Sequence, residues 1–391
     1  MRCSTVATAL VAVFISYLGA PAAVKAGGYI ETDLVADVNP LIDKNGISHT
    51  SQIQDQNLLN SWGLTSSPTS PFWVSDNNAG VSTLYNVAAG GKSVSKVALT
   101  VSIPTCSDPS GHSGAPTGTV FNITTLPGST PGFMISGVTG DGVTKTSAPA
   151  RFLFATEDGT IVGWNPGVFP PGKTGTSSTF GIIAVPENCA SPVNASYKGL
   201  AIATTSGGAF LYAANFQTGM VDRYDTNFQV MNSFTDPKAG EAFHPFNVVV
   251  IDDKLYVTFA VRNPQTGNNV PGKGSGIVSV FNLDGTFDKR FAEGGHLKAP
   301  WGMALAPSSN FGPLAGTLWI GNFGDGHINA FDPTSGAFID QVRDSNGNPI
   351  VIDGLWALRV GTATTCGTNT VCFTAGPNDE KDGLLGSLNP N

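Results

Sequence analysis

The sequence predicts an all-β chain that folds as a six-bladed β-propeller with four-stranded blades. One phrase occurs six times along the 391 residues: an apolar strand, a polar turn with Asn or Asp and a Gly, then an alternating strand. A second phrase, a short strand that begins at an aromatic residue or a glycine, precedes most copies, and helical periodicity is absent. Units of four short strands that repeat about every 40 to 50 residues are typical of propeller blades.

The six copies differ in length but keep the same order of strand, turn and strand. They lie at residues 72–86, 152–165, 211–225, 255–282, 318–332 and 371–388, and the fourth is interrupted. The inner-strand phrases begin near Trp62, Gly118, Gly199, Phe246, Trp301 and Trp356. The long gap between the second and third phrases predicts an insertion at about 166–192.

A strand-like segment, residues 29–37, stands before the first blade. An open ring would leave two sheet edges unpaired, and unpaired edges invite aggregation. We therefore expect this segment to close the ring as the outermost strand of the last blade, beside residues 383–388. The alternative is a disordered N-terminus.

Residues 1–26 are typical of a signal peptide. Arg2 is followed by an apolar run over 6–18, and small residues at Val24 and Ala26 suit cleavage after residue 26. The alternative is an uncleaved anchor. We expect a secreted protein with a single propeller domain over residues 27–391.

Four cysteines remain after the predicted cleavage, an even number that favours two disulfides in an exported protein. Cys366 and Cys372 flank a four-residue loop, which favours their pairing and leaves Cys106 with Cys189. Four cysteines allow three pairings, so sequence alone leaves the choice open. Sequons at Asn122 and Asn194 predict a glycoprotein in a host that glycosylates.

Composition argues against several partners. Charged residues make up 12% of the chain, and 20 basic against 28 acidic residues give a net charge of −8. Nucleic-acid binding needs clustered Lys and Arg, so we expect none. No apolar run after the N-terminus has the length of a membrane span. We expect a monomer.

The blade phrase resembles the NHL-type propeller repeat. A wider set of segments, including Asn57–Leu64, Ala299–Ala304 and Phe373–Glu380, resembles an uncharacterised family of exported propeller proteins, some of whose bacterial members end in a PEP-CTERM sorting tail. The resemblance implies the fold and no activity. Residues 388–391 have no such tail, so we expect free secretion.

In a propeller, the loops before each inner strand and between the second and third strands open on one face. We therefore expect polar residues of these loops to gather at one mouth of the central channel and bind a ligand. They are Asn57, Asn60, Asp76, Asn77, Glu157, Asp158, Lys198, Asn215, His244, Lys298, Asn322, Asp325, Asp353, Asn378 and Asp379. The alternative is that Asp and Asn at these positions serve their own turns.

Three functions remain open. The first is a binding module that recognises an extracellular protein or glycan through this face. The second is a calcium-dependent hydrolase, similar to six-bladed lactonases and esterases, with Ca²⁺ held in the channel by some of Asn60, Asn215, Asn247, Asn322 and Asp353. The third is a structural wall or matrix protein.

Overall fold

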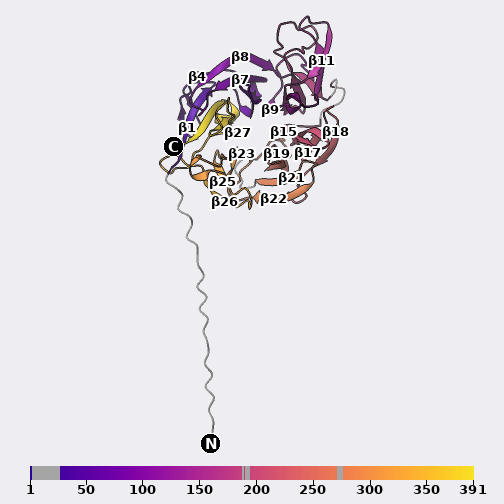
Figure 1. Cartoon of the computed structure of the whole chain (residues 1–391). Helices are drawn as coiled ribbons and strands as arrows, with labels where there is room; N and C mark the ends of the chain where they lie inside the picture. Colours follow the sequence, from indigo (N-terminus) through magenta and orange to yellow (C-terminus); the bar gives the residue numbers. More distant parts are fainter. Residues whose placement is uncertain (2–26, 187–188, 190–193, 271–275) are drawn as a thin grey trace.

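The computed structural model describes residues 1, 27–186, 189, 194–270 and 276–391. They form a ring of six blades, each built on four antiparallel strands (Figure 1). The predicted signal peptide, residues 1–26, lies outside the described residues apart from Met1. In the described part of the chain, no helix is long and apolar enough to cross a membrane.

Each blade runs from an inner strand at the centre to an outer strand at the rim. Blade one has β5 (Ser61–Thr65), β6 (Phe72–Asp76), β7 (Val81–Val87) and β8 (Val94–Ser102); blade two has β9 (Pro116–Phe121), β12 (Phe152–Thr156), β13 (Ile161–Trp164) and β14 (Ile182–Val185); blade three has β15 (Tyr197–Thr205), β16 (Gly208–Asn215), β17 (Met220–Tyr224) and β18 (Val230–Phe234).

The second half of the ring has the same pattern. Blade four has β19 (Phe243–Ile251), β20 (Lys254–Val261), β21 (Ile277–Asn282) and β22 (Phe287–Glu293); blade five has β23 (Pro300–Leu305), β24 (Leu318–Asn322), β25 (Ile328–Phe331) and β26 (Phe338–Gln341); blade six has β27 (Leu355–Val360), β28 (Val371–Ala375), β29 (Leu384–Pro390) and β1 (Tyr29–Ala36). The predicted six-bladed all-β fold is therefore confirmed.

The N-terminal strand closes the ring, as the sequence predicts. Strand β1 pairs antiparallel with β29, from Tyr29 opposite Pro390 to Ala36 opposite Leu384, and the short β4 (Ile53–Gln54) pairs with β1 in parallel. The Tyr29 hydroxyl donates to the carbonyl of Phe311, 2.8 Å away, in the connection between β23 and β24 of blade five. The closing strand thus joins the last blade to its neighbour as well as to the C-terminus.

Two hairpins and four single turns stand outside the blades. They are β2 (Leu41–Ile42) with β3 (Ser48–His49), β10 (Met134–Val138) with β11 (Lys145–Pro149), the 3-10 turns η1 (Asn77–Ala79), η2 (Ile123–Thr125) and η4 (Gly312–Leu314), and α1 (Pro377–Glu380). The β10–β11 hairpin projects from the rim of the ring (Figure 1). The sequence did not predict it, because a lone hairpin between β9 and β12 leaves no repeat to compare.

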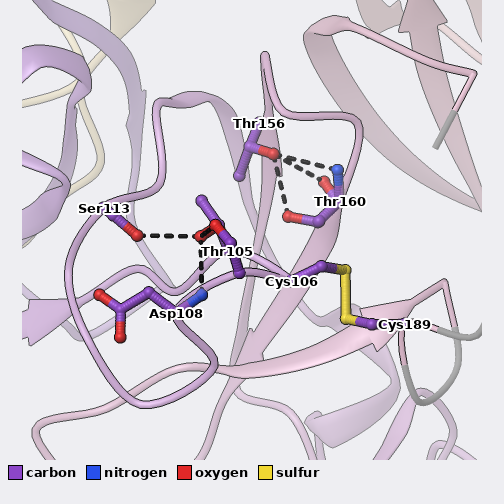
Figure 2. The surroundings of a disulfide bond; sticks show 8 residues. Thr105, Cys106, Asp108, Ser113, Thr156, Thr160 and Cys189 are labelled. Carbon is purple, nitrogen blue, oxygen red and sulfur yellow. Dashed lines mark hydrogen bonds between the residues drawn. A yellow bond between two sulfur atoms is a disulfide. The ribbon is translucent and has the colours of Figure 1, made fainter. Parts of the chain in front are cut away.

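Both predicted cysteine pairs lie at disulfide distance. Cys106 joins Cys189 with 5.5 Å between their Cα atoms, and Cys366 joins Cys372 with 6.7 Å. The first pair links the loop after blade one to the loop after blade two. Figure 2 shows Thr105 beside it, whose hydroxyl accepts from the backbone N–H of Asp108 at 3.2 Å.

The two sequons differ in the folded protein. Asn122 is fully buried, and its Nδ2 donates to the carbonyls of Gly132 at 3.1 Å and Ala150 at 2.7 Å. A glycan on that nitrogen would have to break both bonds, so the structure contradicts glycosylation of folded Asn122. Asn194 is exposed, and its glycosylation stays a prediction.

Candidate functional site

Five polar side chains from four blades meet where the inner strands begin. We call them the polar mouth: Asn60 before β5, Asn77 in η1, Glu157 in the β12–β13 turn, Lys198 in β15 and Glu380 at the end of α1. Four of them belong to the predicted channel-mouth set. Glu380 was missed, because a glutamate one residue beyond an Asn-Asp turn has no repeat signature.

Asn60 is the centre of the polar mouth. It is buried and has a left-handed φ of 48°. Its Nδ2 lies 3.3 Å from Oδ1 of Asn77 and 3.3 Å from Oε1 of Glu380. Its Oδ1 accepts from Nε1 of Trp356 at 2.9 Å. Both ends of this amide are therefore fixed, and Asn60 joins blades one and six.

An ion pair joins blades two and three. Nζ of Lys198 contacts Oε1 of Glu157, and Nδ2 of Asn77 donates to the other Glu157 oxygen at 3.1 Å. Lys198 is 4% exposed, and its Nζ lies 5.2 Å from the centre of the Trp62 ring. An ammonium over an aromatic face gains cation–π stabilisation, which offsets part of the cost of burying it.

Glu380 adds a second carboxylate to the polar mouth. Burial raises its pKa above the ordinary value, the nearby charge of Glu157 raises it further, and Lys198 and Asn60 act in the opposite direction. The polar mouth thus has two carboxylates and two side-chain amides against one ammonium group. Such an excess of acceptors favours a ligand that donates hydrogen bonds.

An aromatic plug lies against the polar mouth at the hub of the ring. It consists of Trp62, Trp301, Trp356 and Phe246, and each side chain is at most 4% exposed. The Trp62 and Trp356 rings stack with centroids 3.5 Å apart, and Trp301 meets Trp62 edge-on at 6.0 Å. The hub at this level is therefore filled by side chains and leaves no open passage for an ion.

The other predicted mouth residues bond other parts of the protein. Asp76 is buried and accepts from the backbone and hydroxyl of Thr83, across its own hairpin, at 3.0 and 2.7 Å. Asp158 accepts from the N–H of Ala115 at 2.7 Å, and His244 Nδ1 bonds the carbonyl of Phe216 at 2.6 Å. The last two contacts join separate loops, so local turn chemistry accounts for Asp76 alone among these three.

The remaining predicted mouth residues also have partners within the protein. Asp325 pairs with Lys298 at 2.8 Å. Lys44 pairs with Asp353 at 2.9 Å and with Asp379 at 3.2 Å. Asn378 donates to the carbonyl of Ile42 at 2.8 Å, and the N–H of Asn57 donates to Asp55 at 3.1 Å. None of these contacts involves a side chain of the polar mouth.

The five residues of the calcium alternative have separate hydrogen-bonding partners. Asn215 caps its own turn, accepting from the N–H groups of Gln217 and Thr218 at 3.2 and 3.3 Å. Asn247 donates to the carbonyl of Trp301 at 2.8 Å, and Asn322 donates to that of His296 at 2.7 Å. Within the described residues, these two, Asn60, Asn215 and Asp353 share no hydrogen-bonding partner, and calcium binding by this set stays a prediction.

A cavity of about 540 Å³ occupies the opposite end of the hub, and sequence reasoning missed it. The second halves of all six inner strands line it, from Gly63–Ser66 in blade one to Ala357–Val360 in blade six. Trp301 and Asn247 line it as well, so the aromatic plug bounds the cavity on the side of the polar mouth. We call this space the hub cavity.

A separate cluster lies on the closing strand. Oxygens of Glu31 and Asp33 lie 3.8 and 3.2 Å from Nδ1 of His49, which is 4% exposed. In the described part of the chain, these three are the one group of His, Cys, Asp or Glu close enough to hold a metal ion. Burial and the charge of Asp33 raise the pKa of Glu31 to about 7.

Comparisons with known proteins give relatives over most of the chain. It is 30% identical over 356 residues to an uncharacterised protein of Acanthamoeba polyphaga mimivirus, covering 88% of this chain and 77% of that protein. A second uncharacterised protein of the same virus is 33% identical over 343 residues, covering 85% and 81%. No family model matches.

Solved structures with a similar arrangement are distant in sequence. A streptogramin B lyase structure has a TM-score of 0.44 at 11% identity and covers 93% of this chain and 98% of that one. The PQQ-bound aldose sugar dehydrogenase of Streptomyces coelicolor has a TM-score of 0.44 at 14% identity, with the same coverage. Neither likeness bears on activity. By its sequence, the chain belongs to the same family as the two uncharacterised mimivirus proteins.

Proposed function

We propose that the protein is an exported binding module whose polar mouth recognises an extracellular glycan. The observation that carries this proposal is the convergence of five polar side chains from four blades at one end of the hub. A propeller holds such groups on short loops between rigid sheets, so their positions are fixed before a ligand arrives. Preorganisation of this kind lowers the cost of binding.

The chemistry of the polar mouth suits a ligand with many hydroxyl groups. Glu380 accepts one bond from Asn60, and its Oε2 has no hydrogen bond within the described residues. Asn77 and Lys198 both donate to Glu157. Their donor groups are therefore occupied, and acceptor oxygens of the polar mouth remain in excess. Sugar hydroxyls donate to carboxylates, and charge-assisted bonds of this type are stronger than neutral ones.

Export is supported by two features that arise independently. Residues 1–26 have the pattern of a signal peptide. The two cysteine pairs lie at disulfide distance, and disulfides persist in oxidising compartments. We expect the protein in the culture medium of its host to begin near Gly27.

A glycan array tests the function. The purified protein should bind a subset of glycans, and Glu380→Gln should weaken that binding about tenfold, because a neutral amide replaces a charged acceptor. Asp332→Asn, which changes an exposed turn in blade five, is the matched control and should bind normally. Binding that survives Glu380→Gln, or an array without any signal, would contradict the proposal.

A further inference from the structure

The hub cavity is lined by a half-buried cation, Arg359, that has no partner within the described residues. Arg359 lines it from β27, and within the described residues it has neither a side-chain hydrogen bond nor an acidic group within ion-pair distance. Its Nε is buried without any partner. Buried charges in proteins are nearly always paired, because desolvating an ion without compensation is costly.

Arg223 and Arg262 also have a buried Nε that lacks a partner within the described residues. Each of these two still makes another side-chain hydrogen bond, to Asn232 and Gln217 respectively, whereas Arg359 makes none within the same residues. Arg290 pairs with Asp236 at 2.8 Å, and Arg343 pairs with Asp340 at 3.0 Å. Arg151 has no side-chain partner within the described residues either, but it is exposed and water solvates it. Burial lowers the pKa of Arg359 to about 10, which still leaves it charged at neutral pH.

The rest of the hub cavity is mostly apolar. Leu64, Val120, Leu200 and Met303 are among its lining residues. Of the residues that line it, Asp252 alone is acidic; it is exposed on the β19–β20 turn in blade four and makes no ion pair with Arg359. The lining therefore offers one positive group beside a large apolar surface.

A second polar group in the hub cavity also lacks a partner. Ser66 directly follows β5, the inner strand of blade one, which neighbours β27 in the ring. It is 5% exposed, lines the cavity, and its hydroxyl has no hydrogen bond in the described part of the chain. Two unpaired hydrogen-bond donors at one cavity are what an anionic ligand would satisfy.

We propose that the hub cavity binds a small organic carboxylate, with its carboxylate at Arg359 and its apolar body against the inner strands. A guanidinium group matches a carboxylate with two parallel hydrogen bonds. A cavity of about 540 Å³ is within the usual size range of small-molecule sites. This site is distinct from the polar mouth, since the aromatic plug separates them.

Calorimetric titration with octanoate tests the site. We expect one octanoate per chain, with 1-octanol, which has the same chain length but no charge, binding at least about tenfold more weakly. Inorganic phosphate, which has the charge but no apolar body, should also bind more weakly. No octanoate binding, or equal binding of octanoate and octanol, would overturn the proposal.

Variants locate the binding and separate it from a structural role of Arg359. Arg359→Met should lose about tenfold or more in octanoate affinity, whereas Arg151→Met removes the same charge from the surface and should bind normally. Arg359→Met should also keep or raise the melting temperature without ligand, because it removes a half-buried charge that has no acidic partner within the described residues.

A fall in melting temperature would instead mark Arg359 as structural and contradict the site. Ser66→Ala, a second variant at the same cavity, should weaken octanoate binding by a smaller factor. Glu380→Gln should leave octanoate binding unchanged, so failure at the polar mouth and failure at the hub cavity are distinguishable.

Discussion

The two ends of the central hub differ in how their polar groups are paired. At the polar mouth, charged and amide groups bond one another and leave Oε2 of Glu380 as a free acceptor within the described residues, and three tryptophans fill the space behind them. At the hub cavity, mostly apolar side chains surround a void of about 540 Å³, and Arg359 has no partner in the described part of the chain.

The difference lies in where large side chains fall along the inner strands. Trp62, Trp301 and Trp356 stand at or near the beginning of β5, β23 and β27, so their rings meet at one level of the hub. Further along these strands the residues are smaller, as at Gly63 and Gly302. A Cβ on Gly302 would lie 2.3 Å from the carbonyl oxygen of Trp356, so neighbouring inner strands pack closely there. The positions of the tryptophans along the inner strands thus decide which end of the hub is filled by side chains.

The largest expected effect on stability comes from truncating one tryptophan of the aromatic plug. Trp356→Ala should lower the free energy of unfolding by about 3–5 kcal/mol, because it leaves a large void in a fully buried site. Urea denaturation measures the loss. Trp356→Phe is the matched control and should lose less, mainly the bond from Trp356 to Asn60. A loss below about 1 kcal/mol for Trp356→Ala would show that the plug does not stabilise the ring.

Removing Lys198 and removing Arg359 should change the free energy of unfolding in opposite directions. Lys198→Met should cost about 1–2 kcal/mol, since it leaves Glu157 without its partner; the value is discounted because the Glu157 side chain is 32% exposed. Arg359→Met should cost nothing or stabilise, because its charge is half-buried and has no partner within the described residues. Equal losses in urea denaturation would contradict the distinction between the two ends.

The closing strand should make stability fall as pH rises, independently of either end. The raised pKa of Glu31, about 7, and the raised pKa of His49 both mean that the folded protein holds protons more tightly than the unfolded chain. The contribution of Glu31 to the free energy of unfolding is therefore complete below about pH 4.5, where Glu31 is protonated in both the folded and the unfolded state. It declines as the pH rises toward 7 and above.

Glu31→Gln should flatten this profile, because the amide does not titrate. Asp33, Asp43 and His49 face Glu31 and stay in place in this variant. Melting temperatures measured from pH 4 to 8 for both proteins check the slope. A wild-type profile that rises with pH would reverse the sign and contradict the account.

The smallest expected effect is that of pH on ligand binding at the two ends of the hub. Glycan binding at the polar mouth should strengthen as pH rises through the raised pKa of Glu380, because the carboxylate is the better acceptor. Octanoate binding at the hub cavity should be flat from pH 6 to 8, since Arg359 has a pKa of about 10. Glycan titrations from pH 4 to 8 and octanoate titrations from pH 6 to 8 separate the two sites.

The fold could be predicted from the sequence because its signal is repeated. Six copies of one strand phrase fix the number of blades, and the strand-like segment at 29–37 has a single open edge to pair with. Spacing favoured the observed cysteine pairs, although the sequence alone left three pairings open. The β10–β11 hairpin occurs once and gave no such signal.

The candidate sites were only partly predictable. Asn60, Asn77, Glu157 and Lys198 meet because equivalent loops of a propeller share one face. Which Asn or Asp serves its own turn depends on local hydrogen bonds, as at Asn215, and one sequence does not specify these. Arg359 is a single charge within an ordinary strand, and only the surrounding structure shows that its Nε has no partner among the described residues.

A crystal structure of the protein with octanoate tests the contrast between the two ends most directly. The account predicts an octanoate in the hub cavity, with its carboxylate within hydrogen-bonding distance of Arg359 and its chain among the apolar residues of the inner strands. Octanoate at the polar mouth, or a cavity in which Arg359 bonds a protein acid instead, would contradict it.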